Sequence, residues 1–353
     1  MKNATLPKML FFGLISSLFI GCNETPKEDS TITISGAITE DTRWTSDKLY
    51  VLDKQVTVTP GTTLTIEAGT VIKANPGEAP NVSMLVVARN AKIMAKGTPE
   101  QPIIFTSIND NVDPKTGTKS SLNQSDVGLW GGIILLGNAP VSLGNYDDET
   151  FYIGLEPNSD NSYYGGEDKD DNSGVMEYVS IRHGGVFIGT GSESNGLTLC
   201  GVGAKTTINQ VEIFANQDDG IELFGGTVDV SNLIVYASSD DAIDIDEGYN
   251  GTISNYSITM VEDADNAIEI NGGPGEDSGD FRLVNGRIDG SNLDKTLLYT
   301  IDEKAKGSIT HLELVNVKEA EKAINSTAVI IEENASKEEK NSPDFSWTRS
   351  KEN

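Results

Sequence analysis

A repeat of 22–25 residues constrains this chain more than any other feature of its sequence. Two kinds of hexapeptide recur at nearly constant offsets. INQVEI (208–213), VSNLIV (230–235) and ISNYSI (253–258) are separated by 22 and 23 residues, and DDGIEL (218–223), DDAIDI (240–245) and DNAIEI (265–270) by 22 and 25. Amphipathic helices or a β-sandwich do not return the same residue types at a fixed offset, whereas the coils of a parallel β-helix do. The sequence therefore predicts an all-β, single-stranded, right-handed parallel β-helix.

Stacking of the coils predicts columns of like side chains about 4.8 Å apart. Two inward columns are Ile221, Ile243 and Ile268, and Leu223, Ile245 and Ile270; a column of side-chain amides at a bend is Gln210, Asn232, Asn255 and Asn285, with His311 next. Because no helix interrupts these repeats, we expect one β-helix over residues 32–334, interrupted by a long loop at 145–174.

The two ends of a β-helix expose an apolar cross-section and must be covered. We expect residues 31–52 to cap the first coil. The polar tail, residues 335–353, contains Phe345 and Trp347, which we expect to dock back on the last coils.

The first 21 residues read as a lipoprotein signal peptide. Lys2 and Lys8 make a basic start, and the apolar run 9–20 is too short to span a bilayer. Gly21-Cys22 then resembles the end of a lipobox, with Phe19 in place of the usual leucine, so Cys22 is predicted to be acylated. An ordinary cleaved signal with an incidental cysteine would read similarly. Residues 22–31 form a short polar tether.

The net charge favours cations and opposes nucleic acid. The chain has 26 basic and 54 acidic residues, and removal of the signal takes away two lysines and no acid, which leaves a charge of −30. Nucleic-acid and anionic-lipid binding are therefore set aside. The other cysteine, Cys200, lies in an alternating strand and has no partner for a disulfide, so stability must come from a core, from metal, or from both.

Several stretches resemble one family of exported bacterial proteins. They are TLTIEAGTVIK (63–73), the run 85–107, LWGGIILLGNAPVS (129–142), NSGVMEYVSIRHGG (172–185), NGLTLCGVG (195–203) and NQDDGIELFGGTVDV (216–230). The sequence resembles the pectin-lyase-like β-helix proteins common in Bacteroidetes. The resemblance implies a pectin-lyase-like solenoid and export, and it supplies no catalytic residues, because the family has no settled activity. Within the tether, Lys27-Glu28-Asp29 resembles the surface-export signal of some Bacteroidetes lipoproteins, although a solvated linker would look the same.

Stacked carboxylates are the first candidate site. Asp218, Asp240 and Asp265 form one column, Asp219, Asp241 and Asn266 another, and Glu222, Asp244 and Glu269 a third. Carboxylates about 5 Å apart repel unless a cation binds, a proton is shared, or the side chains turn into water. Ca²⁺ favours such oxygen ligands, so Asp240, Asp241 and Asp244 are predicted metal ligands. The alternative is a set of solvated turn residues.

The 145–174 loop is the second candidate. Exposed aromatic rings stack on apolar sugar faces, which makes Tyr146, Tyr152, Tyr163 and Tyr164 candidate glycan-binding residues. Asp168, Asp170 and Asp171 are candidate Ca²⁺ ligands, although the loop lacks the distal glutamate of an EF-hand. The alternative is a loop whose rings pack on the flank of the helix.

His183 completes a possible catalytic set with Asp219 and Asp241, because a histidine beside stacked acids can act as a general acid or base. Polysaccharide lyases and glycoside hydrolases with this fold use such a groove, but the sequence lacks the hydrolase order of motifs and a basic cluster for an acidic sugar chain. A turn histidine bonded to backbone is the competing interpretation.

We therefore expect a non-catalytic lipoprotein at the outer membrane, facing outward, that binds a glycan or an outer-membrane transport complex and is stabilised by Ca²⁺. The alternatives are a polysaccharide lyase or glycoside hydrolase, and a structural spacer.

Overall fold

The computed structural model describes Met1 and residues 31–113, 119–142, 150–152, 154–155, 159–189, 192–275, 279–291, 293–333 and 345–349. The predicted signal peptide after Met1, the acylation site Cys22, the tether up to Ser30, Tyr146 and residues 335–344 lie outside the described residues. In the described part of the chain, no helix is long and apolar enough to cross a membrane.

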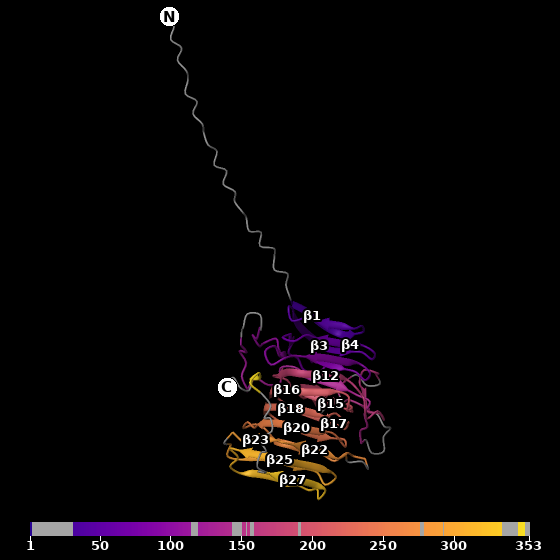
Figure 1. The fold of residues 1–353 in the computed structure, drawn as a ribbon, viewed down its shortest axis with the longest axis vertical. Coiled ribbons are helices and arrows are strands. Elements are labelled where there is room, and N and C mark those ends of the chain that lie inside the picture. The colour runs from indigo at the N-terminus through magenta and orange to yellow at the C-terminus, as the bar shows by residue number, and fades with distance from the viewer. Residues whose placement is uncertain are drawn as a thin grey trace. The chain divides into compact units, whose positions relative to one another are not determined.

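The chain winds into a stack of coils whose strands pair in parallel along three faces (Figure 1). Face A contains β6 (Met84–Val87), β9 (Ile133–Leu136), β15 (Leu197–Cys200), β17 (Ile221–Phe224), β19 (Ile243–Asp246), β21 (Asn266–Ile270), β24 (Thr296–Ile301) and β26 (Ala320–Ile324). Face B contains β5 (Val71–Ala74), β8 (Ile103–Ser107) and β23 (Arg287–Asp289). Face C contains β2 (Thr42–Trp44), β4 (Thr63–Ile66), β7 (Lys92–Lys96), β22 (Phe281–Val284) and β27 (Val329–Glu333).

The longer strands turn a corner and contribute to two faces. The first half of each of β12 (Gly174–Arg182), β16 (Thr207–Asn216), β18 (Val230–Ser238), β20 (Thr252–Thr259) and β25 (Gly307–Val315) pairs on face C and the second half on face B. The strands β1 (Thr31–Ile38) and β3 (Leu49–Val58) likewise run from face B to face A. Two antiparallel hairpins stand outside the coils: β10 (Thr150–Phe151) with β11 (Tyr163–Tyr164), and β13 (Phe187–Gly189) with β14 (Ser192–Glu193).

The strand register confirms the repeat as the coil. Ile221 pairs with Ile243 and Ile243 with Ile268, while the neighbouring inward column runs from Leu223 through Ile245 to Ile270. These side chains are at most 2 % exposed and belong to one continuous apolar core that runs the length of the stack. A residue that recurs every 22–25 positions therefore lies directly above its copy.

The predicted amide column forms the corner between faces C and B. Asn232, Asn255 and Asn285 have φ between +55° and +58°, which asparagine tolerates better than most residues. The side-chain Nδ2 of Asn255 donates to Asn232 Oδ1, and Nδ2 of Asn285 donates to Asn255 Oδ1, each over 3.3 Å. Gln210 and His311 hold the same corner of their coils, with φ of +55° and +57°, as predicted. The hydrogen-bonded ladder itself continues from the Asn232 side chain to Asn209 Oδ1 and not to Gln210.

Both ends differ from the sequence-based expectation. Residues 31–52 do not form a separate cap, because β1 and β2 pair in parallel with β3 and β4 and so supply the first coil. Trp347 docks near the middle of the stack and not on the last coils: its Nε1 donates to Gln210 Oε1 over 3.1 Å and its ring meets Tyr178 edge-on. Phe345 in the same short segment is half-buried.

The outer surface of face A changes character along the stack. In the N-terminal coils it is apolar, and a second buried cluster there joins Met84, Ile134 and Cys200 to side chains of the 145–174 loop. On β17, β19 and β21, the outward position in register with Thr198 of β15 is acidic, whereas Phe224, the second outward residue of β17, is still apolar. Described side chains of the loop thus pack on the apolar outward positions as far as Phe224 of β17.

Candidate functional site

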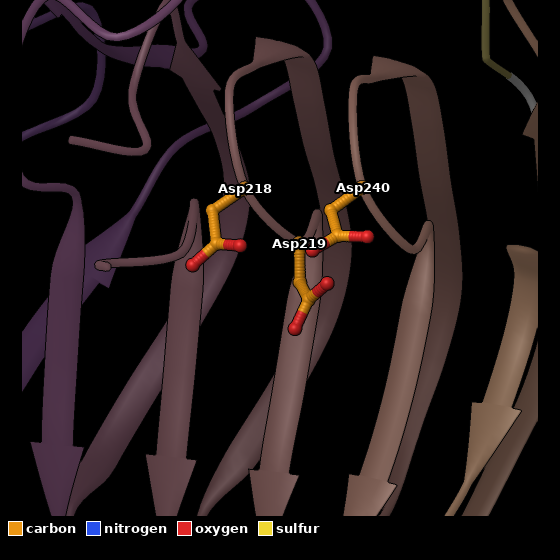
Figure 2. Close-up of side chains that lie close together, drawn as sticks. All are labelled: Asp218, Asp219 and Asp240. Carbon is orange, nitrogen blue, oxygen red and sulfur yellow. The ribbon is translucent and has the colours of Figure 1, made fainter. Parts of the chain in front are cut away.

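The candidate site is built by outward side chains of β17, β19 and β21 and by the turns that lead into these strands. Glu222, Asp244 and Glu269 pair in register on successive strands. The turns contribute acids one coil apart, and Figure 2 shows Asp218, Asp219 and Asp240 on neighbouring coils with their carboxylates close together. This set, called the acidic cluster below, comprises Asp218, Asp219, Glu222, Asp240, Asp241, Asp244, Asp265 and Glu269.

The carboxylates meet in four overlapping groups of three, in each of which one oxygen per residue lies within 4.8 Å of the others. The groups are Asp218/Asp219/Asp240, Asp219/Glu222/Asp244, Asp240/Asp241/Asp265 and Asp241/Asp244/Glu269. The second and fourth groups are the more deeply buried, because Asp219, Asp241 and Asp244 are 7, 2 and 6 % exposed.

Two of the buried acids are fixed by the next coil. The backbone N–H of Asp241 donates to Asp219 Oδ1 over 3.0 Å, and the N–H of Asn266 donates to Asp241 Oδ1 over 2.6 Å. A side-chain carboxylate therefore links each turn to the next, which explains why an acid recurs at this position of the repeat.

Glu222 also has a partner, because the side-chain amide of Asn195 donates to it. Asp244 is different: its Oδ1 is buried and has no hydrogen-bond partner. A buried carboxylate oxygen without a donor is costly, because the group loses its hydration and gains nothing in exchange. At Asp244, therefore, no hydrogen bond offsets the cost of burying the carboxylate oxygen Oδ1.

Burial and mutual repulsion raise the pKa values of six members of the cluster: Asp218, Asp219, Glu222, Asp240, Asp241 and Asp244. Desolvation, followed by a contact with Glu269, raises the pKa of Asp241 to about 9, and desolvation with the charges of Glu193 and Asp240 raises that of Asp218 to about 7. Burial raises the pKa values of Asp219, Glu222 and Asp244 well above their ordinary range, with neighbouring carboxylates as the next cause. No lysine or arginine is among the main influences on the pKa values of these described groups.

The chemistry of the donor set fits a hard divalent cation. All ligand atoms are carboxylate oxygens, which Ca²⁺ prefers, and they converge from three consecutive coils. The predicted ligands Asp240, Asp241 and Asp244 lie in this cluster. Asp218, Asp219, Glu222, Asp265 and Glu269 join them, and the constant offsets of the repeat carried that signal. Asn195 was not predicted to belong to the site, although SNGLTL (194–199) is a weaker copy of DDGIEL (218–223). Leu197 pairs with Ile221, which places Asn195 at the repeat position of Asp219.

The second predicted metal set does not assemble. Among the described acids, Asp168, Asp170 and Asp171 form no group of three convergent ligands. Asp170 pairs with Lys205 over 3.1 Å, and the nearly buried Asp171 accepts from Asn138 and Ser173. The prediction was wrong because closeness in sequence does not make side chains converge when the backbone turns them in different directions.

The predicted platform of exposed tyrosines is also wrong for two of its members. Tyr152 and Tyr164 are 5 and 4 % exposed and pack against the Phe224 ring on face A. The Tyr164 hydroxyl donates to Glu247 over 3.1 Å, which ties the loop to the turn after β19. Tyr163 is half-buried, with Arg89 over its ring.

His183 does not join Asp219 and Asp241. Its ring is fully buried, donates from Nδ1 to the carbonyl oxygen of Asp126 over 2.5 Å, and packs edge-on against Phe214. Burial lowers its pKa, and the acids that act on it are Asp110 and Asp126. The predicted catalytic set is therefore not brought together.

The fold and the site define a class: parallel β-helices with an acidic outer face. Residues 36–328 match the family model of the pectate-lyase-like β-helix domain. The chain belongs to that family. A comparison with curated proteins finds no significant match.

Proposed function

We propose that this protein is a non-catalytic, cation-binding β-helix whose acidic cluster holds Ca²⁺. The observation that carries the proposal is Asp244, a carboxylate that is 6 % exposed, has an oxygen without a hydrogen-bond donor, and lies among other converging acids. Replacing the missing donors with a cation would remove both the repulsion and the desolvation penalty.

Calcium in this role joins three coils into one rigid surface. We propose that the protein is exported and anchored to the outer membrane through lipid on Cys22, facing outward. There the stiffened face A would present its surface to a glycan or to a partner complex in the membrane. The lipobox-like sequence at Cys22 and the net charge of −30 after signal removal support this arrangement.

The enzymatic alternative has less support from the geometry. A glycoside hydrolase needs two accessible carboxyl groups on either side of a sugar bond. Here Asp219 and Asp241 are buried and accept backbone N–H groups of the next coil. Release of reducing ends from a polysaccharide panel, abolished by Asp241→Asn, would favour the enzyme instead.

Calcium is expected to raise the melting temperature of the chelator-treated protein by about 5 °C or more at saturating concentration, because a ligand that binds only the folded state stabilises it by mass action. Differential scanning calorimetry of the full chain in detergent, with EGTA and then with excess calcium, measures the shift.

Asp170→Asn is the matched control, because it removes an exposed acid that pairs with Lys205 outside the cluster. This variant should keep the whole shift. Superimposable melting curves with EGTA and with calcium would refute the proposal.

A further inference from the structure

The two deeply buried groups of the acidic cluster share one residue. One group is Asp219, Glu222 and Asp244, and the other is Asp241, Asp244 and Glu269. Asp244 is the only member common to both, and it lies on the middle strand, β19, between β17 and β21. The two groups are therefore related by one coil, a step of about 4.8 Å.

The charge of the two groups together exceeds what one ion can offset. Five carboxylates take part: Asp219, Glu222, Asp241, Asp244 and Glu269. A single divalent cation leaves three negative charges in a largely buried space, whereas two cations leave one. Pairs of metal ions bridged by ligands are stable at separations of about 4 Å, which is close to the coil spacing.

The outward column that contains Asp244 ends on both sides in neutral residues. Thr198 pairs with Glu222 on the preceding coil, and Thr300 pairs with Glu269 on the following one. The Thr300 hydroxyl donates to the Asn266 side chain over 2.9 Å, so it is already engaged. The acidic column therefore has room for two buried cations and does not continue into a longer row of cation sites.

Asp244 itself supplies the observation that is independent of the acids around it. Its column neighbour Glu222 accepts from Asn195, and Asp219 and Asp241 accept backbone N–H groups. Only Asp244 presents a buried oxygen with no donor among the described residues of the cluster. A carboxylate can bridge two cations through one oxygen or through both, and the unpartnered Oδ1 of Asp244 is available for metal.

We propose that Asp244 bridges two divalent cations, one bound with Asp219 and Glu222 and the other with Asp241 and Glu269. This inference rests on the proposed cation-binding function and adds the number of ions and the bridging ligand. Each ion has two carboxylate ligands that it does not share. Loss of one of these unshared ligands should weaken the binding of one ion, whereas loss of Asp244 should weaken the binding of both.

Calorimetric titration of the chelator-stripped full chain with calcium tests the bridge. The wild type is expected to bind two ions tightly, and Glu222→Gln and Glu269→Gln are each expected to keep one tight ion. Asp244→Asn is expected to weaken both sites by about 100-fold or more, because each ion loses a charged ligand. The control Asp170→Asn should still bind two.

The outcomes separate the two proposals. No calcium binding by the wild type would overturn the proposed function and the bridge together. A wild-type stoichiometry of one, or an Asp244→Asn variant that retains one tight ion, would overturn the bridge alone. If Asp244→Asn does not fold, Glu222→Gln and Glu269→Gln still test the bridge. Loss of both ions in either variant would contradict it, because Glu222 and Glu269 are each proposed to bind only one ion.

Discussion

Asp244→Asn is expected to raise the melting temperature of the chelator-treated protein and to weaken strongly its stabilisation by calcium. Without a cation, Asp244 must either stay ionised while buried or take up a proton, and both cost free energy at pH 8. Asparagine has nearly the same shape as aspartate and carries no charge. The substitution therefore removes the cost of burying or protonating the carboxylate and should stabilise the metal-free protein by about 1–3 kcal/mol. The same change should make the calcium-loaded protein less stable than wild type.

This change of sign between EGTA and calcium distinguishes a metal ligand from an ordinary buried residue. Calorimetry of wild type and variant under both conditions provides the four melting temperatures. Asp170→Asn should leave all comparisons unchanged, because Asp170 is exposed and paired with Lys205. An Asp244→Asn protein that is less stable than wild type in EGTA, and that calcium stabilises as much as it does wild type, would contradict the role assigned to Asp244.

In EGTA, the free energy of unfolding is expected to fall as the pH rises from about 5 to 9. The pKa values of Asp246, Asp218 and Asp241 are raised to about 6, 7 and 9, mainly by burial. The folded protein therefore holds protons that the unfolded chain has released near pH 4. Stability from these groups is fully present below their unfolded pKa values and is lost as the pH rises through the folded ones, with a combined effect of several kcal/mol.

Calcium should flatten this profile, since a bound cation replaces the protons and favours the ionised carboxylates. The stabilisation by calcium is therefore expected to grow with pH, and urea unfolding at a series of pH values with and without the ion measures it. A stability that rises between pH 5 and 9 in EGTA, or a calcium effect that is larger at pH 5 than at pH 8, would be inconsistent with stacked, buried acids.

The repeat predicted the coils because a solenoid converts sequence spacing into spatial contact. Ile221, Ile243 and Ile268 illustrate this: offsets of 22 and 25 residues in sequence placed them on adjacent strands with no further information. The amide ladder was predictable for the same reason, since Asn232 and Asn255 occupy one corner of successive coils.

The same reasoning failed wherever the chain leaves the coil. Nothing in the periodicity reports how the 145–174 loop folds back, and the rings of Tyr152 and Tyr164 are buried because face A is apolar beneath them. His183 lies in a coil, but the residues that surround it, such as Asp126, come from an irregular segment.

The candidate site was predictable in composition but not in detail. The offsets brought the acids of three coils together, while their burial and the missing donor at Asp244 depend on packing that only the structure describes.

The most direct test is a crystal structure of the protein grown with a calcium-mimicking ion that scatters anomalously, such as Mn²⁺ or Tb³⁺, at pH 8. We expect anomalous peaks on both sides of the Asp244 carboxylate, one toward Glu222 and one toward Glu269. Well-ordered carboxylates in the same positions, with no peak beside Asp244, would contradict this expectation.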